Sequence, residues 1–93
     1  MSSATAHKRK VIMGHAPYGL HMRPAAELAK CARQWNGTTT LYLGEQSADG
    51  TSPSELMMLM AMPGAELTLE ADGPEAEQWL DAFEKILSLP HAP

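Results

Sequence analysis

A histidine, an arginine and a proline stand close together near position 20, as His21, Arg23 and Pro24. Proline is favoured in the first turn of a helix, because the N–H group that it lacks would have no partner there. The sequence therefore predicts a helix that begins at Met22, with His21 just ahead of its unpaired backbone amides. Those amides carry the positive end of the helix dipole and form a ready site for an anion.

This arrangement of side chains could hold a phosphoryl group. A neutral histidine is a competent nucleophile near neutral pH, and the guanidinium of Arg23 offers a planar, charged fork for phosphate oxygens. Phosphoryl transfer depends mainly on positioning and charge stabilisation, which the amides of Met22 and Arg23 would add to. His21 is therefore our candidate phosphoryl acceptor. On spacing alone, the alternative is a capping histidine beside a solvated arginine.

The length and composition predict one small globular domain. The chain has 93 residues, 44% hydrophobic and 19% charged, which suits a packed core rather than disorder. We expect a single domain over residues 1–93, with an ordered core over about 8–89 and tails at 1–7 and 90–93. The net charge of −4 and the pI near 5.4 argue against a nucleic acid as the main partner.

The cysteine content and the hydropathy predict a cytoplasmic protein. The single cysteine, Cys31, cannot form an internal disulfide, which fits a reducing compartment. Residues 1–10 lack the apolar stretch of a signal peptide, and no apolar run approaches the roughly 20 residues that span a bilayer. We therefore expect no membrane association, and nothing in the sequence indicates an obligate dimer, so we expect a monomer.

Hydrophobic periodicity and turn residues predict seven elements in alternating order. They are a strand at 10–13, a helix at 22–35, strands at 38–43 and 46–48, a helix from Ser52 to about 60, a strand at 65–71 and a helix opened by 72–75. The order is βαββαβα, a split βαβ arrangement. It predicts an α/β (α+β) open-faced sandwich, in which a four-stranded antiparallel sheet carries three helices on one face.

The motif Gly19-Leu20-His21-Met22-Arg23-Pro24-Ala25 resembles the active-site signature of the HPr family, the histidine phosphocarriers of the bacterial phosphotransferase system. The likeness extends roughly from Val11 to Leu87, with the elements in the same order. It implies that His21 is phosphorylated and that Arg23 stabilises the phosphate. It also implies a phosphoryl group that comes from enzyme I, charged by phosphoenolpyruvate, and leaves for an enzyme IIA. Such a protein is a stoichiometric carrier in sugar transport, without a cofactor.

The resemblance also implies a partner surface and a regulatory site. Lys30 and Arg33 match basic positions on the outer face of the first helix, and Met22 and Met57 could add apolar contact. Ser52 matches a serine that a kinase phosphorylates in some bacteria. The alternative roles are a solvated helix face for the two bases and a plain helix N-cap for Ser52.

Two departures from the family pattern leave the partners open. Pro53-Ser54-Glu55 replaces the usual apolar residues and lysine, and Tyr18 replaces a common asparagine. These changes favour, as a second hypothesis, a specialised or nitrogen-type regulatory module whose phosphorylation controls the binding of a target. A third hypothesis is an interaction domain that is not phosphorylated at all.

Three further patterns predict packing rather than chemistry. The run of methionines from Met57 to Met62 could suggest Cu(I), but its helical spacing favours core packing. The four histidines have no metal-ligand spacing with acids or with Cys31, so we expect no metal. Cys31 is expected to be a small core residue, and Trp35 and Trp79 to pack in the core or at helix ends.

Overall fold

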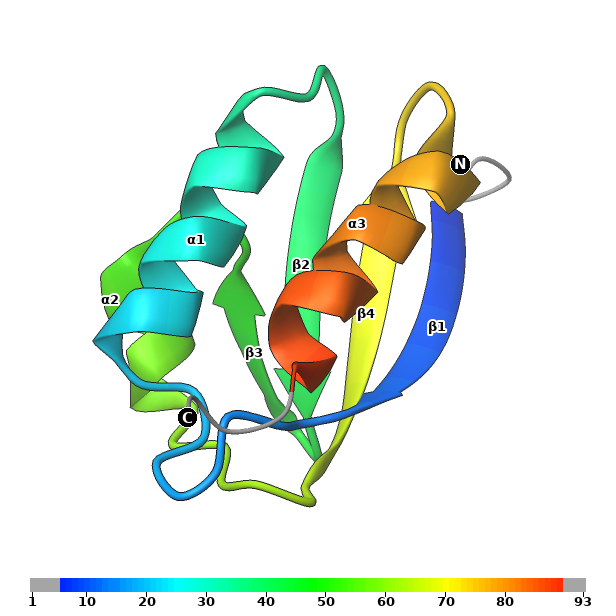
Figure 1. Ribbon diagram of the computed structural model, residues 1–93. Helices are drawn as coiled ribbons and strands as arrows, with labels where there is room; N and C mark the ends of the chain where they lie inside the picture. Colours follow the sequence, from blue (N-terminus) through cyan, green and yellow to red (C-terminus); the bar gives the residue numbers. More distant parts are fainter. Residues whose placement is uncertain (1–5, 90–93) are drawn as a thin grey trace.

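A four-stranded antiparallel sheet with three helices on one face forms the protein, as expected from the order βαββαβα (Figure 1). The structure is a computed structural model and describes residues 6–89. Its elements are β1 (Ala6–Ile12), α1 (Met22–Arg33), β2 (Thr38–Leu43), β3 (Gln46–Asp49), α2 (Pro53–Met58), β4 (Glu66–Asp72) and α3 (Ala76–Ser88). The strands are arranged in the order β1-β4-β2-β3.

The core lies between the sheet and the helices α1 and α3, which lie side by side in Figure 1. Alternation along β4 points Leu67, Leu69 and Ala71 into it, as the sequence predicts, and all three are fully buried. The helices contribute their apolar stripes. Their fully or almost fully buried members are Ala25, Leu28, Ala29 and Ala32 of α1 and Leu80, Phe83 and Leu87 of α3.

The two tryptophans close one end of this core. Trp35 follows α1 and stacks on Trp79 of α3 with ring centroids 5.8 Å apart. The indole Nε1 of Trp35 donates to the carbonyl of Pro74 at 2.7 Å, so its polar atom is satisfied despite burial. The helix α1 itself ends at Arg33, two residues before the predicted end. Trp35 instead bonds through its N–H to the carbonyl of Ala32, three residues back, which tightens the last turn.

The first strand is longer than the sequence predicts. The sequence predicts a start at Lys10, but β1 begins at Ala6, because its backbone pairs with β4 from Ala6↔Asp72 to Ile12↔Glu66. Ala6 and His7, expected in the tail, therefore lie in the strand. Residues 6–10 are mostly charged or polar, so they show no apolar alternation that would predict a strand. They are in a strand because they pair with β4. The remaining tail residues, 1–5 and 90–93, lie outside the described residues.

An ion-pair network fastens this edge strand to α3. The guanidinium of Arg9 bonds to Asp81 at 2.5 Å, to Glu77 at 2.9 Å and to Glu84 at 3.1 Å. His7 adds a contact from its Nδ1 to Glu77 at 2.7 Å. The hydrogen bonds from His7 and then from Arg9 hold the pKa of Glu77 below its usual value.

The methionine run does not pack as predicted. Met58, Met60 and Met62 are 75%, 77% and 56% exposed, so the expectation of core packing is wrong for them. The helix α2 ends at Met58, and Met60 has a positive φ of 56°, which takes the chain out of helical periodicity. The core positions here are taken by leucine and alanine instead, namely Leu56, Leu59 and Ala61.

Cys31 is half-buried and packs against the core, as the sequence predicts. Burial raises the pKa of its thiol, which lowers the fraction of reactive thiolate. Within residues 6–89, no helix is both long and apolar enough to cross a membrane.

Candidate functional site

His21 occupies the N-cap position of α1. Its backbone is extended, with φ −94° and ψ −168°, and its carbonyl accepts the first helical hydrogen bond, from the N–H of Ala25 at 3.0 Å. The imidazole Nδ1 accepts from the backbone N–H of Arg23 at 3.4 Å. Because an amide can only donate, the lone pair of the ring is on Nδ1 and faces the amide end of the helix. A group bound to Nδ1 would meet those amides.

A glycine brings the chain into this position. Gly19 has a φ of +71°, a conformation that side chains disfavour, and a Cβ there would overlap the carbonyl oxygen of Ala61. That carbonyl accepts the N–H of the next residue, Leu20, at 2.8 Å, and Leu20 is buried in the core. The loop before His21 is thus fastened to the connection between α2 and β4.

The same loop is also fastened to the end of α3. The N–H groups of Gly14 and His15 donate to the carbonyls of Leu87 and Leu89 at 2.9 and 2.7 Å. The site therefore forms where the β1–α1 connection, the α2–β4 connection and the end of α3 meet at one end of the sheet, at the bottom of Figure 1.

Two aromatic rings stand edge-on to His21. The ring centroid of Tyr18 lies 5.7 Å away and that of His15 lies 6.2 Å away, with interplanar angles of 76° and 78°. Tyr18 is exposed, whereas His15 is partly buried. Sequence reasoning considered His15 only as a metal ligand and missed this pairing. The signal that could have found it was a second histidine in the loop that must lead into the site.

Arg23 has an exposed side chain beside this site. Within residues 6–89, its guanidinium makes no hydrogen bond or ion pair with another side chain or carbonyl, so the fork is available to a ligand. The other basic residues of α1 lie further along the helix. Lys30 is exposed, and Arg33 donates from Nε to the carbonyl of Thr51 at 3.1 Å, which ties α1 to the loop before α2.

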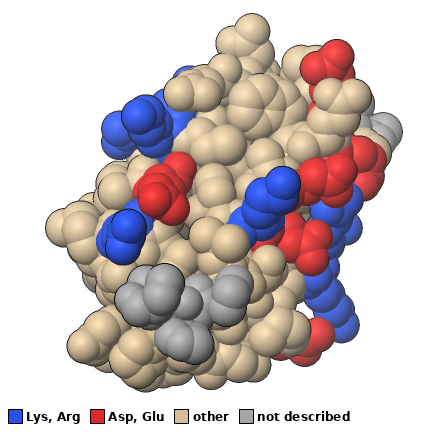
Figure 2. Space-filling view, in the orientation of Figure 1, with Lys and Arg blue, Asp and Glu red and all other residues tan. Residues whose placement is uncertain are grey.

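The charged groups of this face are segregated. Figure 2 shows mainly blue side chains over the α1 side, with some red among them. On the α3 and β1 side, acidic and basic groups alternate. The basic side of the face is therefore the one that carries the His21 helix.

Ser52 caps α2. Its hydroxyl accepts from the N–H of Glu55 at 3.3 Å and lies 3.2 Å from the hydroxyl of Ser54. The carboxylate of Glu55 in turn accepts from the N–H of Asp49 at 2.9 Å. This bonding gives Ser52 a structural role at the helix start.

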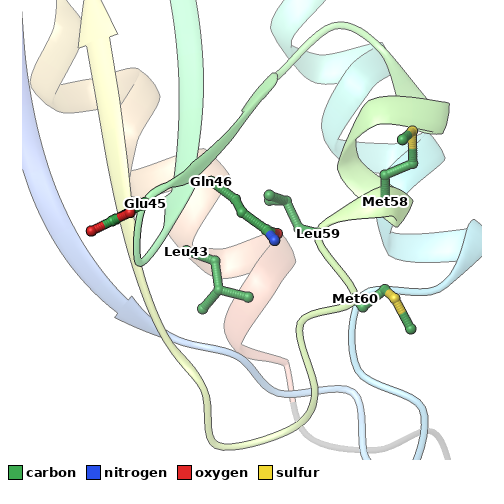
Figure 3. A pocket seen from close by; sticks show the side chains of 6 residues that line it. All are labelled: Leu43, Glu45, Gln46, Met58, Leu59 and Met60. Atoms are coloured by element: carbon green, nitrogen blue, oxygen red, sulfur yellow. The ribbon is translucent and has the colours of Figure 1, made fainter.

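The predicted apolar contacts separate into two groups. Met22 is 60% exposed next to His21, but Met57 is half-buried against the core. Met58 and Met60 stand exposed instead, and they line an open pocket of about 630 Å³ between the end of α2 and the β2–β3 turn (Figure 3). Leu43, Glu45, Gln46 and Leu59 complete its lining.

A family model described as "PTS HPr component phosphorylation site" matches residues 8–88. Among curated relatives, the phosphocarrier protein HPr of Haemophilus influenzae is 36% identical over 80% of this chain and 84% of its own length. The phosphocarrier protein NPr of Shewanella violacea is 38% identical over 70% of this chain and 71% of its own length.

A larger relative contains a similar segment. The phosphoryl donor subunit DhaM of a PEP-dependent dihydroxyacetone kinase, from Providencia stuartii, is 36% identical over 75% of this chain, which spans only 15% of that protein. A solved HPr structure from Bacillus anthracis superposes with a TM-score of 0.81 over 89% of this chain and 98% of its own, at 22% identity, and so supports the fold. The chain belongs to the HPr family of phosphocarrier proteins.

Proposed function

We propose that the protein carries a phosphoryl group on His21, which it accepts from enzyme I and passes to a histidine of an enzyme IIA. Phosphoenolpyruvate is the original donor in this scheme, and the cytoplasm is its location. The observation that carries the proposal is the placement of Nδ1 of His21 at the amide end of α1, 3.4 Å from the backbone nitrogen of Arg23.

The geometry supports a direct transfer between two imidazoles. The lone pair on Nδ1 of His21 attacks the phosphorus of the donor phosphohistidine, and the P–N bond of the donor breaks as the new P–N bond forms. The electron pair of the broken bond returns to the donor ring. The backbone N–H of Arg23 lies at Nδ1, where it would meet the charge on the transferred oxygens, and the guanidinium of the same residue would add a positive charge. In the transfer to enzyme IIA, phosphorylated His21 is the donor and the histidine of enzyme IIA is the nucleophile.

The partner surface in this proposal surrounds His21. Lys30 and Arg33 would steer acidic partners toward α1, and Met22 and Met57 would contribute apolar contact. The exposure of Met58 and Met60 extends that apolar area beyond the residues that the sequence indicates.

The direct test is phosphorylation in the presence of enzyme I and phosphoenolpyruvate, followed by mass spectrometry of the intact chain. We expect a gain of one phosphoryl group that is labile in acid and stable in base. His21→Ala should abolish it, whereas His7→Ala, a histidine change on the distant edge strand, should leave it intact. A phosphate that persists in His21→Ala would show that another residue accepts it.

A second candidate is a regulatory module, favoured by the Pro53-Ser54-Glu55 segment and by the likeness to an NPr protein. In that case the chain would accept the phosphoryl group from enzyme I but would not pass it to a sugar-specific enzyme IIA. A transfer assay that follows labelled phosphate from the chain to candidate enzyme IIA proteins separates the two. A kinase acting on Ser52 would be a further regulatory partner in either case.

A further inference from the structure

Two neighbouring histidines of the site lie at helix ends of opposite polarity, one at the start of α1 and one at the end of α3. His21 caps the start of α1, and His15, whose ring centroid is 6.2 Å away, lies at the end of α3. His15 adopts a positive φ of 58°, which is uncommon for a residue other than glycine. Residues in such strained backbone conformations cluster at functional sites.

The ring of His15 is fixed by the last turn of α3. Its Nε2 lies 2.5 Å from the carbonyl oxygen of Ile86, and its backbone N–H donates to the carbonyl of Leu89 at 2.7 Å. Because a carbonyl can only accept, Nε2 carries the hydrogen in this bond. The bond therefore fixes both the position of the ring and the nitrogen that is protonated.

The helix ends act on the two rings in opposite directions. Ile86 belongs to the last turn of α3, where carbonyls without a partner inside the helix form the negative end of the dipole and favour a cation. His21 lies at the positive end of α1, which favours an anion bound to its ring. The two helix ends thus place a site that suits positive charge, at His15, beside a site that suits an anion, at His21.

We propose that His15, in its cationic form, is an electrostatic partner of the phosphoryl group on His21. The inference rests on the proposed function of His21 and adds a residue that the family motif does not contain. A phosphoryl group bound to Nδ1 of His21 would bring one to two negative charges next to the ring of His15.

The surroundings of His15 leave it free for this role. Among the described residues, His21 is the titratable group whose ring stands against that of His15, and Tyr18 stands on His21 in turn. Arg23 on α1 and Lys85 in the last turn of α3 are the nearest cationic residues along these elements. Within residues 6–89, no carboxylate forms an ion pair with His15, so a phosphoryl group on His21 would not compete with a carboxylate for its ring.

The test is a ³¹P NMR titration of the chain phosphorylated on His21. Phosphoramidate can supply the group without enzyme I, and the signal absent from His21→Gln identifies phospho-His21. In His15→Gln, which keeps a donor for the carbonyl of Ile86 but cannot become cationic, we expect the pH midpoint of the phosphoryl titration to rise by about 0.5 unit. His15→Asn, which tolerates the positive φ, should behave alike. His7→Gln, on β1, should leave the midpoint unchanged.

The outcomes separate this inference from the proposed function. An unchanged midpoint in both folded His15 variants would overturn the role of His15, even if enzyme I phosphorylates His21 normally. A phosphoryl group found on His15 rather than His21 would also overturn it. A raised midpoint would support it, even if enzyme I failed to phosphorylate the chain, a result that would count against the proposed function alone.

Discussion

The imidazole Nδ1 of His21 and the backbone nitrogen of Arg23 lie 3.4 Å apart, beyond the range of about 2.7–3.2 Å that is typical of such hydrogen bonds. A phosphoryl group on Nδ1 must displace this bond, and a long bond costs little to displace. The freed N–H can then donate to a phosphate oxygen. In the proposed function, the cap of the unphosphorylated helix would thus become an anion contact after transfer.

Removing the charge of Arg23 should slow phosphoryl transfer while the fold stays intact. Arg23→Gln keeps the backbone amide and loses the guanidinium, whose charge-assisted bonds are worth roughly 1.5–3 kcal/mol, so we expect about a tenfold to hundredfold slower reaction with enzyme I. Rapid-quench kinetics measures the effect. Lys8→Gln makes the same charge change on β1 and should be nearly silent. Equal losses in both variants would point to general charge steering instead.

Gly19→Ala should disrupt the loop that leads into the site. A Cβ there meets the carbonyl of Ala61 in addition to the strain of a positive φ. Gly44→Ala is the matched control, because it shares the positive φ but has nothing within 4 Å of its Cβ. We expect Gly44→Ala to cost about 1–2 kcal/mol in the free energy of unfolding, and Gly19→Ala clearly more, with loss of phosphorylation. Denaturant unfolding gives both values, and equal costs would contradict the close approach.

The link between β1 and α3 should weaken in acid. The pKa of Glu77 is held down by His7 and Arg9, so its carboxylate stabilises the fold above the unfolded pKa, and this contribution disappears as the pH falls through the folded pKa. We expect Glu77→Gln to lower the melting temperature at pH 7, and the difference from the wild type to close as the pH falls below the ordinary pKa of a glutamate, about 4.3. Calorimetry over this range measures it. Glu45→Gln, at the β2–β3 turn, should show no such pH dependence.

Ser52 offers a way to separate capping from charge. Ser52→Ala removes the acceptor for the N–H of Glu55 and should cost about 1 kcal/mol of stability. Ser52→Asp keeps an acceptor and adds a negative charge, so we expect stability close to that of the wild type. If the serine is regulatory, Ser52→Asp should also accept the phosphoryl group from enzyme I more slowly than Ser52→Ala. Equal rates in the two variants would argue against regulation at this residue.

The exposed methionines should matter for binding and not for stability. Met58→Ser and Met60→Ser remove apolar surface that is already in water, so we expect changes in unfolding free energy within about 0.5 kcal/mol. We expect a higher KM with enzyme I. Leu59→Ala, at a position 5% exposed between them, should cost roughly 2–5 kcal/mol. A large loss of stability in Met60→Ser would contradict the observed exposure.

The sequence predicts the helix start at His21 better than it predicts the neighbours of that histidine. Pro24 and the residues around it mark the start of α1 through local chemistry, so the position of His21 could be read directly. The pairing of His15 with His21 depends on the end of α3, some seventy positions away along the chain, and no local pattern contains it. The exposure of Met60 was missed for a related reason, because a single backbone turn there ends the helical periodicity.

The loop that carries His21 is fastened on one side to Ala61 and on the other to the last carbonyls of α3. Both anchors are backbone groups, so they do not depend on which side chains stand on the outer faces of α1 and α2. Those faces are free to diverge in sequence without disturbing the position of the His21 ring. Substitutions on those faces alone would therefore change which signalling or transport proteins bind, while the geometry that supports phosphorylation stays the same.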